Sequence, residues 1–138
     1  MHGLVALWRE NNPQVAITLD ADLDRLELDE TAQLTVYRVV QEGLTNALRH
    51  AQATRIDIAV GPAKTGPAKG LSIRLQDNGS GLPGGTKPGF GLSGMSERVW
   101  ALGGTMTMTN SPSGGLLLAV ELPLAPDRER QTDRKSVV

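Results

Sequence analysis

Cysteine is absent from this sequence of 138 residues, which excludes disulfide bonds and thiolate metal sites. Because there are only two histidines, we do not expect a structural zinc site either. No apolar run approaches the roughly 20 residues that a membrane-spanning helix needs. A net charge of −1 gives no reason to expect binding to nucleic acid or to an anionic membrane, so we expect neither partner.

Aromatic residues are also scarce, at 3%, whereas glycine is abundant, with 16 residues. More than half of the glycines fall between Gly79 and Gly104, so the backbone of that segment must turn tightly, approach a ligand closely or stay mobile. The rest of the composition, with 39% hydrophobic and 21% charged residues, is ordinary for a globular protein. We predict one domain over residues 1–125 and a charged, disordered tail over residues 126–138.

Hydrophobic periodicity divides the chain into helices and strands. Three helices are predicted, over residues 3–10, from a cap at Asp29 or Thr31 to about residue 51, and over residues 92–102. Five strands are predicted, over residues 15–19, 55–60, 71–75, 105–109 and 116–122. Hairpins rather than alternating βαβ units favour an α+β fold, a two-layer sandwich with a mixed, mostly antiparallel sheet and helices on one face.

The predicted helix that ends near residue 51 has two different faces. One is an apolar stripe at three- and four-residue spacing, formed by Tyr37, Val40, Leu44, Leu48 and Ala51. The other is a polar row at four-residue spacing, formed by Glu42, Asn46 and His50. An ordinary surface helix usually carries Lys and Glu at such positions, so a carboxylate, a carboxamide and an imidazole one turn apart indicate a binding site.

Two stretches further along the chain suggest that the ligand is a nucleotide. Asp77 follows a predicted strand and lies beside Gly79 and Gly81, and its carboxylate is a pure acceptor that suits the exocyclic amine of adenine. Residues 89–94 lead into a helix N-terminus, whose free N–H groups and positive dipole end favour phosphate. On the polar row, Asn46 and Glu42 offer oxygens that suit Mg²⁺.

Each feature taken alone has a plainer explanation. Asn46 is as readily a partner for a neighbouring loop, Glu42 a solvated charge, and His50 a cap at the helix end. Residues 77–79 alone are typical of a turn, and residues 89–94 lack the Gly-Lys-Ser/Thr ending of a P-loop. It is the combination, in this order and at these separations, that indicates a nucleotide site.

In combination, the three stretches resemble the ATP-binding catalytic domain of bacterial sensor histidine kinases, within the GHKL superfamily that includes DNA gyrase. Residues 41–51 match the N box, residues 77–81 the first glycine box, and residues 89–98 the second. The motif Gly-Leu-x-Gly-Met followed by Glu-Arg is similar to the corresponding motif of the nitrate and hexose-phosphate sensors. The resemblance covers residues 4–123 and implies a Bergerat-type ATP-binding fold.

The resemblance also implies a role for each matched residue. Asn46 would coordinate Mg²⁺, with Glu42 as a second metal ligand or as the residue that polarises the attacking group, so these two are the expected catalytic residues. Asp77 would read the adenine amine, and residues 82–91 would form a mobile lid. The other expected contacts with ATP are Arg49, His50, Gly79, Gly81, Lys87, Gly89, Gly91, Leu92 and Gly94.

Some features of the family are missing. The family often places Gly-x-Gly-Thr before its last strand, whereas Gly114 and Gly115 are followed here by Leu116, which leaves one hydroxyl contact in doubt. The hydrophobic box ahead of the lid is absent, as is common among nitrate sensors. Neither His2 nor His50 is followed by the acidic residue that accompanies the family's phosphoacceptor histidine.

We therefore expect the catalytic part of a two-component kinase, which donates the γ-phosphoryl of Mg-ATP to a histidine on a dimerisation domain absent from this sequence. The other expected partner is a response regulator. The parent protein is expected to be a homodimer in the bacterial inner membrane, with this domain in the cytoplasm. Two alternatives stay open: a GHKL-type serine kinase of the anti-sigma-factor kind, and a non-enzymatic nucleotide-binding interaction module.

Overall fold

The computed structural model describes residues 2–23, 26, 28–50, 52–63, 70–80, 92–111 and 114–124. The elements, in chain order, are α1 (His2–Asn11), β1 (Ala16–Ala21), α2 (Glu30–Thr45), the π-helix η1 (Asn46–His50), β2 (Arg55–Pro62), β3 (Gly70–Asp77), α3 (Leu92–Ala101), β4 (Thr105–Asn110) and β5 (Leu116–Pro123). Every predicted helix and strand is present, with ends shifted by a few residues. No helix within the described ranges is long and apolar enough to cross a membrane.

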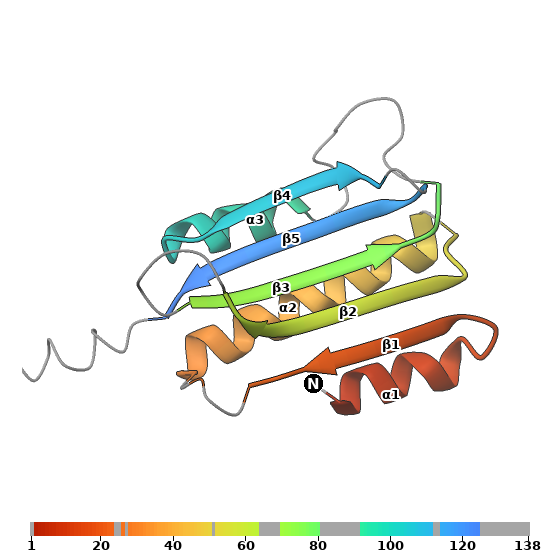
Figure 1. Ribbon diagram of the computed structural model, residues 1–138, viewed down its shortest axis with the longest axis horizontal. Helices are drawn as coiled ribbons and strands as arrows, with labels where there is room; N and C mark the ends of the chain where they lie inside the picture. Colours follow the sequence, from red (N-terminus) through yellow and green to blue (C-terminus); the bar gives the residue numbers. More distant parts are fainter. Residues whose placement is uncertain are drawn as a thin grey trace, which may run out of the picture.

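The five strands form one sheet in the order β1-β2-β3-β5-β4. β1 pairs with β2 in parallel, and the other three pairings are antiparallel. In Figure 1, α2 and α3 lie behind the sheet, and α1 lies beside the β1 edge. The predicted two-layer α+β sandwich with a mixed, mostly antiparallel sheet is therefore confirmed.

The core lies between the helices and one face of the sheet. Alternate residues of the three central strands point into it: Ile56, Ile58 and Val60 of β2, Leu71, Ile73 and Leu75 of β3, and Leu118, Val120 and Leu122 of β5. Each of these side chains is at most 3% exposed, and burial of such a side chain stabilises a fold by roughly 1.5–3 kcal/mol. The opposite face of the sheet carries mostly polar side chains and faces solvent.

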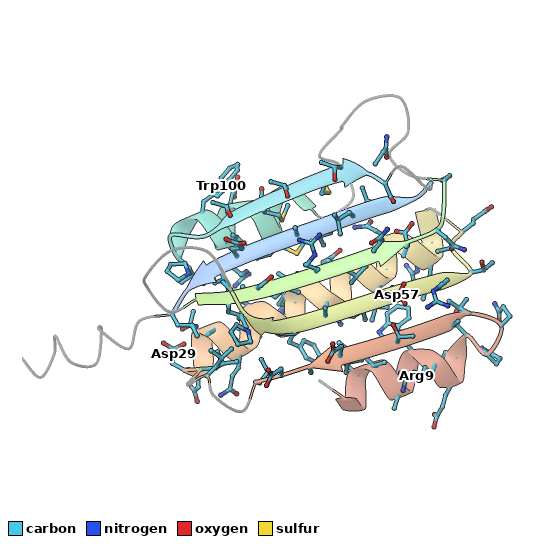
Figure 2. All side chains as sticks on the ribbon, in the orientation of Figure 1. Arg9, Asp29, Asp57 and Trp100 are labelled. Carbon is cyan, nitrogen blue, oxygen red and sulfur yellow. The ribbon has the colours of Figure 1, made fainter. Side chains whose placement is uncertain are left out.

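α2 is capped by Asp29, one of the two predicted capping residues, whose carboxylate accepts the N–H of Ala32 at 2.8 Å. Figure 2 places Asp29 at the end of α2 that is farther from the end of β3. The predicted apolar stripe is wrong at Tyr37, which is 41% exposed, while Val36 and Val39 are buried in its place. Val40 and Leu44 of the predicted stripe are fully buried, Leu48 is half-buried, and Ala51 lies outside the described residues. The buried face of α2 therefore follows the predicted stripe from Val40 onward, but its N-terminal half contains Val36 rather than Tyr37.

The β1 edge of the sheet is covered by α1. Leu4 and Val5 are buried in the core, and Arg9, which Figure 2 labels on α1, reaches back to the sheet. Its Nε donates a hydrogen bond of 2.9 Å to the carbonyl of Ile17 in β1. This contact satisfies an outward-facing backbone group at the strand edge.

Candidate nucleotide-binding site

α2 approaches the sheet closely at Gly43, where an added Cβ would lie 2.6 Å from Cδ1 of Leu75 in β3. α2 and β3 run in the same direction in Figure 1. Asn46 follows Gly43 by about 4.5 Å along the helix axis, and Asp77 follows Leu75 by about 6.8 Å along the strand. The packing of Gly43 on Leu75 thus brings the two predicted binding residues to the same end of the sheet.

Asn46 is 7% exposed, and neither polar atom of its side chain, Oδ1 or Nδ2, has a hydrogen-bond partner among the described residues. Buried polar groups are nearly always paired in native proteins, and an unpaired one costs about 1–3 kcal/mol. An amide that is buried without a partner is therefore best explained by a ligand that it binds. Its oxygen is of the type that Mg²⁺ prefers, so this position fits the predicted metal.

The helix changes its winding at Asn46. The backbone N–H of Asn46 bonds to the carbonyls of both Glu42 and Gly43, and η1 continues as a π-helix to residue 50. The wider turn closes with a hydrogen bond of 3.0 Å from the N–H of Ala53 to the carbonyl of Ala47. π-turns occur frequently at functional sites, and this one breaks the straight polar row that four-residue spacing predicts.

Asp77 is 4% exposed and accepts two backbone hydrogen bonds on the same oxygen. Oδ1 accepts the N–H of Gly79 at 2.8 Å and the N–H of Leu116 at 3.2 Å. The two donors fix the carboxylate from both sides, and both use Oδ1 rather than Oδ2. A carboxylate oxygen is a pure acceptor, which suits an amine of a ligand.

Gly115 allows the β4–β5 turn to approach Asp77. It has a φ of +93°, and a Cβ there would overlap the carbonyl oxygen of Asp77 and lie 2.8 Å from Cα of Asn78. The motif predicts the loss of a hydroxyl contact at Leu116 but does not indicate that the backbone N–H of Leu116 reaches the carboxylate. Only the sheet order, which places β5 beside β3, reveals this contact.

The remaining predicted contacts are divided between described and undescribed parts of the chain. Glu42 is half-buried on α2, Arg49 is exposed on η1, Gly79 is half-buried after β3, and Gly94 is exposed in the first turn of α3. His50 is the last residue of η1 and Leu92 is the first residue of α3, and both element ends lie at the same end of the sheet (Figure 1). The side chains of these two residues are not among those that the structure describes. Outside the described ranges lie Gly81, Lys87, Gly89 and Gly91, with the predicted lid over residues 82–91 and the tail from residue 126.

A separate hollow of about 520 Å³ lies on the other half of α2, lined by Leu23, Leu26, Leu28, Gln33, Val36 and Tyr37. Val36 is about 15 Å from Asn46 along the helix axis. Among the described residues, the lining is mostly apolar and includes no charged side chain. The hollow is thus distinct from the Asn46 end of α2, where the predicted binding residues lie.

Comparison with known proteins identifies the family. Residues 31–126 match the family described as histidine kinase-, DNA gyrase B- and HSP90-like ATPase. The chain belongs to this family. It is therefore an ATP-binding domain, and the matched residues include α2, η1 and every strand of the sheet except β1.

Two curated relatives are similar over most of this chain. The histidine-protein kinase/phosphatase UhpB of Salmonella typhimurium is 42% identical over 106 residues, which cover 76% of this chain and 20% of UhpB. The nitrate/nitrite sensor protein NarQ of Escherichia coli is 32% identical over 124 residues, which cover 88% of this chain and 21% of NarQ. The chain thus spans about a fifth of the length of these relatives.

A solved structure shows the same fold. The histidine kinase domain of the Erythrobacter litoralis EL346 blue-light-activated histidine kinase superposes with a TM-score of 0.69 at 21% sequence identity. The superposition covers 93% of this chain and 61% of that chain. The ATP-binding fold implied by the sequence motifs is confirmed by this likeness.

Proposed function

We propose that this chain is the Mg-ATP-binding catalytic domain of a two-component sensor histidine kinase, extending to about residue 125. The observation that supports it most directly is the buried amide of Asn46, which has no described partner and lies at the same end of the sheet as Asp77. The relatives support the kinase in particular, because UhpB is named as a signal transduction histidine-protein kinase/phosphatase and NarQ as a nitrate/nitrite sensor protein. Neither a serine kinase nor a non-enzymatic module is favoured by them.

The residues of this chain bind and orient the nucleotide. Oδ2 of Asp77 accepts a hydrogen bond from the adenine amine, and the backbone around Gly79 lies against the base. Asn46 would hold Mg²⁺ through its amide oxygen, with Glu42 as the second ligand or as the residue that polarises the attacking group. Bound Mg²⁺ would neutralise phosphate charge, and positioning with charge neutralisation supplies most of the catalysis in phosphoryl transfer.

The phosphoryl acceptor and the further partners come from outside this sequence. We propose that the acceptor is a histidine on the dimerisation domain of the parent protein, and that a response regulator receives the phosphoryl group next. The parent would be a homodimer in the bacterial inner membrane, with this domain in the cytoplasm. Arg49, His50, Lys87 and the glycines of residues 89–94 would contact the phosphates.

Replacing Asn46 by Ala tests the metal assignment. Without the amide oxygen, the metal loses a ligand, so ATP affinity in the presence of Mg²⁺ should fall by at least about tenfold, which corresponds to about 1.4 kcal/mol. Affinity in excess EDTA should change little. Calorimetric titration of both proteins, with and without Mg²⁺, measures the two effects.

Asn12→Ala is the matched control, because the Asn12 side chain also lies at a helix end but donates to the carbonyl of Trp8, at 3.0 Å and away from the site. It should bind Mg-ATP as the wild type does. If Asn46→Ala retained the full Mg²⁺ dependence while remaining folded, the assignment of Asn46 as the metal ligand would be wrong.

A further inference from the structure

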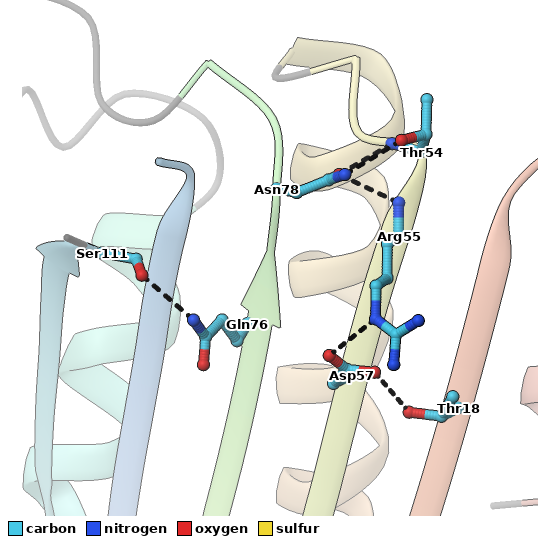
Figure 3. A network of polar contacts seen from close by, with 7 residues as sticks. All are labelled: Thr18, Thr54, Arg55, Asp57, Gln76, Asn78 and Ser111. Atoms are coloured by element: carbon cyan, nitrogen blue, oxygen red, sulfur yellow. Dashed lines mark hydrogen bonds and ion pairs between the residues drawn. The ribbon is translucent and has the colours of Figure 1, made fainter. Parts of the chain in front are cut away.

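Asn78 follows Asp77 directly, and its side chain makes three hydrogen bonds to the start of the neighbouring strand (Figure 3). Its Oδ1 accepts the backbone N–H groups of Thr54 and Arg55, each at 2.9 Å. Its Nδ2 donates to Oγ1 of Thr54, also at 2.9 Å. The backbone N–H of Asn78 adds a bond of 3.2 Å to the carbonyl of Arg55. One side chain thus joins the end of β3 to the beginning of β2.

The strand start that Asn78 holds is also tied to the helix that carries Asn46. Ala53 immediately precedes Thr54, and its N–H bonds to the carbonyl of Ala47 in η1 at 3.0 Å. A continuous path of short contacts therefore leads from Asn46 through residues 47 and 53–54 to Asn78 and Asp77. The two ends of this path are the groups that would bind the metal and the base.

We propose that Asn78 is a positioning residue for nucleotide recognition, which sets the Asp77 carboxylate at a fixed place relative to the Asn46 amide. The inference rests on the proposed function, in which Asp77 reads the base. Asn78 touches neither the base nor the phosphates; it acts through the backbone that it ties on the residue next to Asp77. Gly79, whose N–H orients Oδ1 of Asp77, follows Asn78 and depends on the same anchor.

The contact of Asn78 with Thr54 and Arg55 is exposed, and this allows a positioning role to be distinguished from a purely structural one. Asn78, Thr54 and Arg55 are all exposed, so their backbone N–H groups regain water when the Asn78 side chain is removed. The loss of stability should therefore be modest, whereas the carboxylate beside it loses its fixed position. Base selectivity is the readout that responds to position and not to stability.

The test compares ATP with inosine triphosphate, which carries a carbonyl in place of the adenine amine. The wild type should prefer ATP by at least about tenfold, because a carboxylate bonds to the amine and repels the carbonyl. In Asn78→Ala this preference should fall to about threefold or less, while the Mg²⁺ dependence of binding is retained. Binding constants come from calorimetry on the folded chain at a single temperature.

Two further variants keep the test decisive. Asn78→Asp retains an oxygen that accepts the N–H groups of Thr54 and Arg55, so it should keep the preference for ATP. Its added charge would weaken the binding of ATP and of inosine triphosphate equally and would leave their ratio unchanged. Thr54→Ala removes only the hydroxyl that accepts from Nδ2 and should also keep it. If Asn78→Ala were too unstable to study, loss of the preference in Asn78→Ser would serve in its place.

The outcomes distinguish this inference from the proposed function. If Asp77→Asn abolishes the preference and Asn78→Ala leaves it at the wild-type ratio, the positioning role is overturned and the nucleotide site stands. If Asp77→Asn keeps the wild-type preference, the base-reading role itself is wrong, and the positioning role is overturned with it. The proposal is supported if both Asp77→Asn and Asn78→Ala lose the preference for ATP and Asn78→Asp retains it.

Discussion

At the scale of single residues, Asp57 illustrates a charge on the open face of the sheet (Figure 3). The hydroxyl of Thr18 donates a hydrogen bond of 2.7 Å to its Oδ1, and this contact lowers the pKa of Asp57. Partial burial raises the pKa, whereas the ion pair with Arg55, at 3.2 Å, lowers it further. A lowered folded pKa means that the carboxylate stabilises the fold above its unfolded pKa and ceases to do so as the pH falls through the folded value.

Replacing Asp57 by Asn should therefore have a pH-dependent effect. At pH 7 we expect the free energy of unfolding to fall by less than about 1 kcal/mol, because both partners are largely exposed. The difference from the wild type should shrink below about pH 4, near the unfolded pKa of Asp. Urea unfolding at several pH values measures it, and a difference that stays constant down to pH 3 would contradict the explanation.

Gln52 is the only non-glycine residue with a positive φ among the described residues, at +54°. It follows the π-turn at the end of the Asn46 helix, in the left-handed conformation that glycine adopts most easily. Gln52→Gly should raise the free energy of unfolding by about 1 kcal/mol. Gln52→Ala, which removes the side chain but keeps Cβ, should leave it within about 0.5 kcal/mol; an equal change in both would exclude backbone conformation as the cause.

At the scale of elements, the β4–β5 turn offers a matched pair of glycines. Gly114 and Gly115 have φ values of +95° and +93°, but an added Cβ meets nothing within 4 Å at Gly114 and overlaps the backbone of Asp77 at Gly115. Gly114→Ala should cost about 1–2 kcal/mol from backbone strain alone. Gly115→Ala should cost a further amount of about 1–3 kcal/mol from overlap, and it should also weaken ATP binding.

Chemical denaturation with calorimetric titration of ATP measures both quantities. ATP affinity should be nearly unchanged in Gly114→Ala and clearly reduced in Gly115→Ala, because only Gly115 brings the Leu116 N–H to the Asp77 carboxylate. Equal losses of stability and affinity in the two variants would contradict the view that the turn helps to orient Asp77.

The sequence predicted the elements well because their signals are local. Alternation in residues 55–60 and 71–75 and the Asp29 cap depend only on neighbouring residues, and all were confirmed. The buried face of α2 was wrong at Tyr37 because the shape of the sheet decides which side chains fit under the helix. The π-turn at Asn46 was missed because four-residue spacing assumes a regular α-helix.

At the scale of the whole molecule, the sequence predicted the family and the type of site but not how the site is held together. The motifs around Asn46 and Asp77 are contiguous in sequence, so a resemblance to a known family reveals them. The contacts of Asn78 with Thr54 and of Leu116 with Asp77 join residues 24 and 39 positions apart. Such contacts depend on the strand order β1-β2-β3-β5-β4, which periodicity does not specify.

The two ends of the sheet differ in the residues that they carry. At one end, α2 passes into η1, β3 ends, and β5 and α3 begin (Figure 1). The Asn46 amide, which has no partner among the described residues, and the fixed Asp77 carboxylate therefore lie at the same end as a helix N-terminus. At the other end, Asp29 caps α2. Ligand binding should therefore be confined to the first end, and substitutions at Asp29 should change stability without changing ATP affinity.

Calorimetric titration of ATP into the wild-type chain and into Asp77→Asn tests the central claim most directly. We expect micromolar to sub-millimolar binding in the wild type and binding at least about tenfold weaker in Asp77→Asn, because the amide loses the charge that strengthens a hydrogen bond to the adenine amine. A folded wild-type chain that bound no ATP, or equal affinity in the two proteins, would contradict the assignment of this end of the sheet as the nucleotide site.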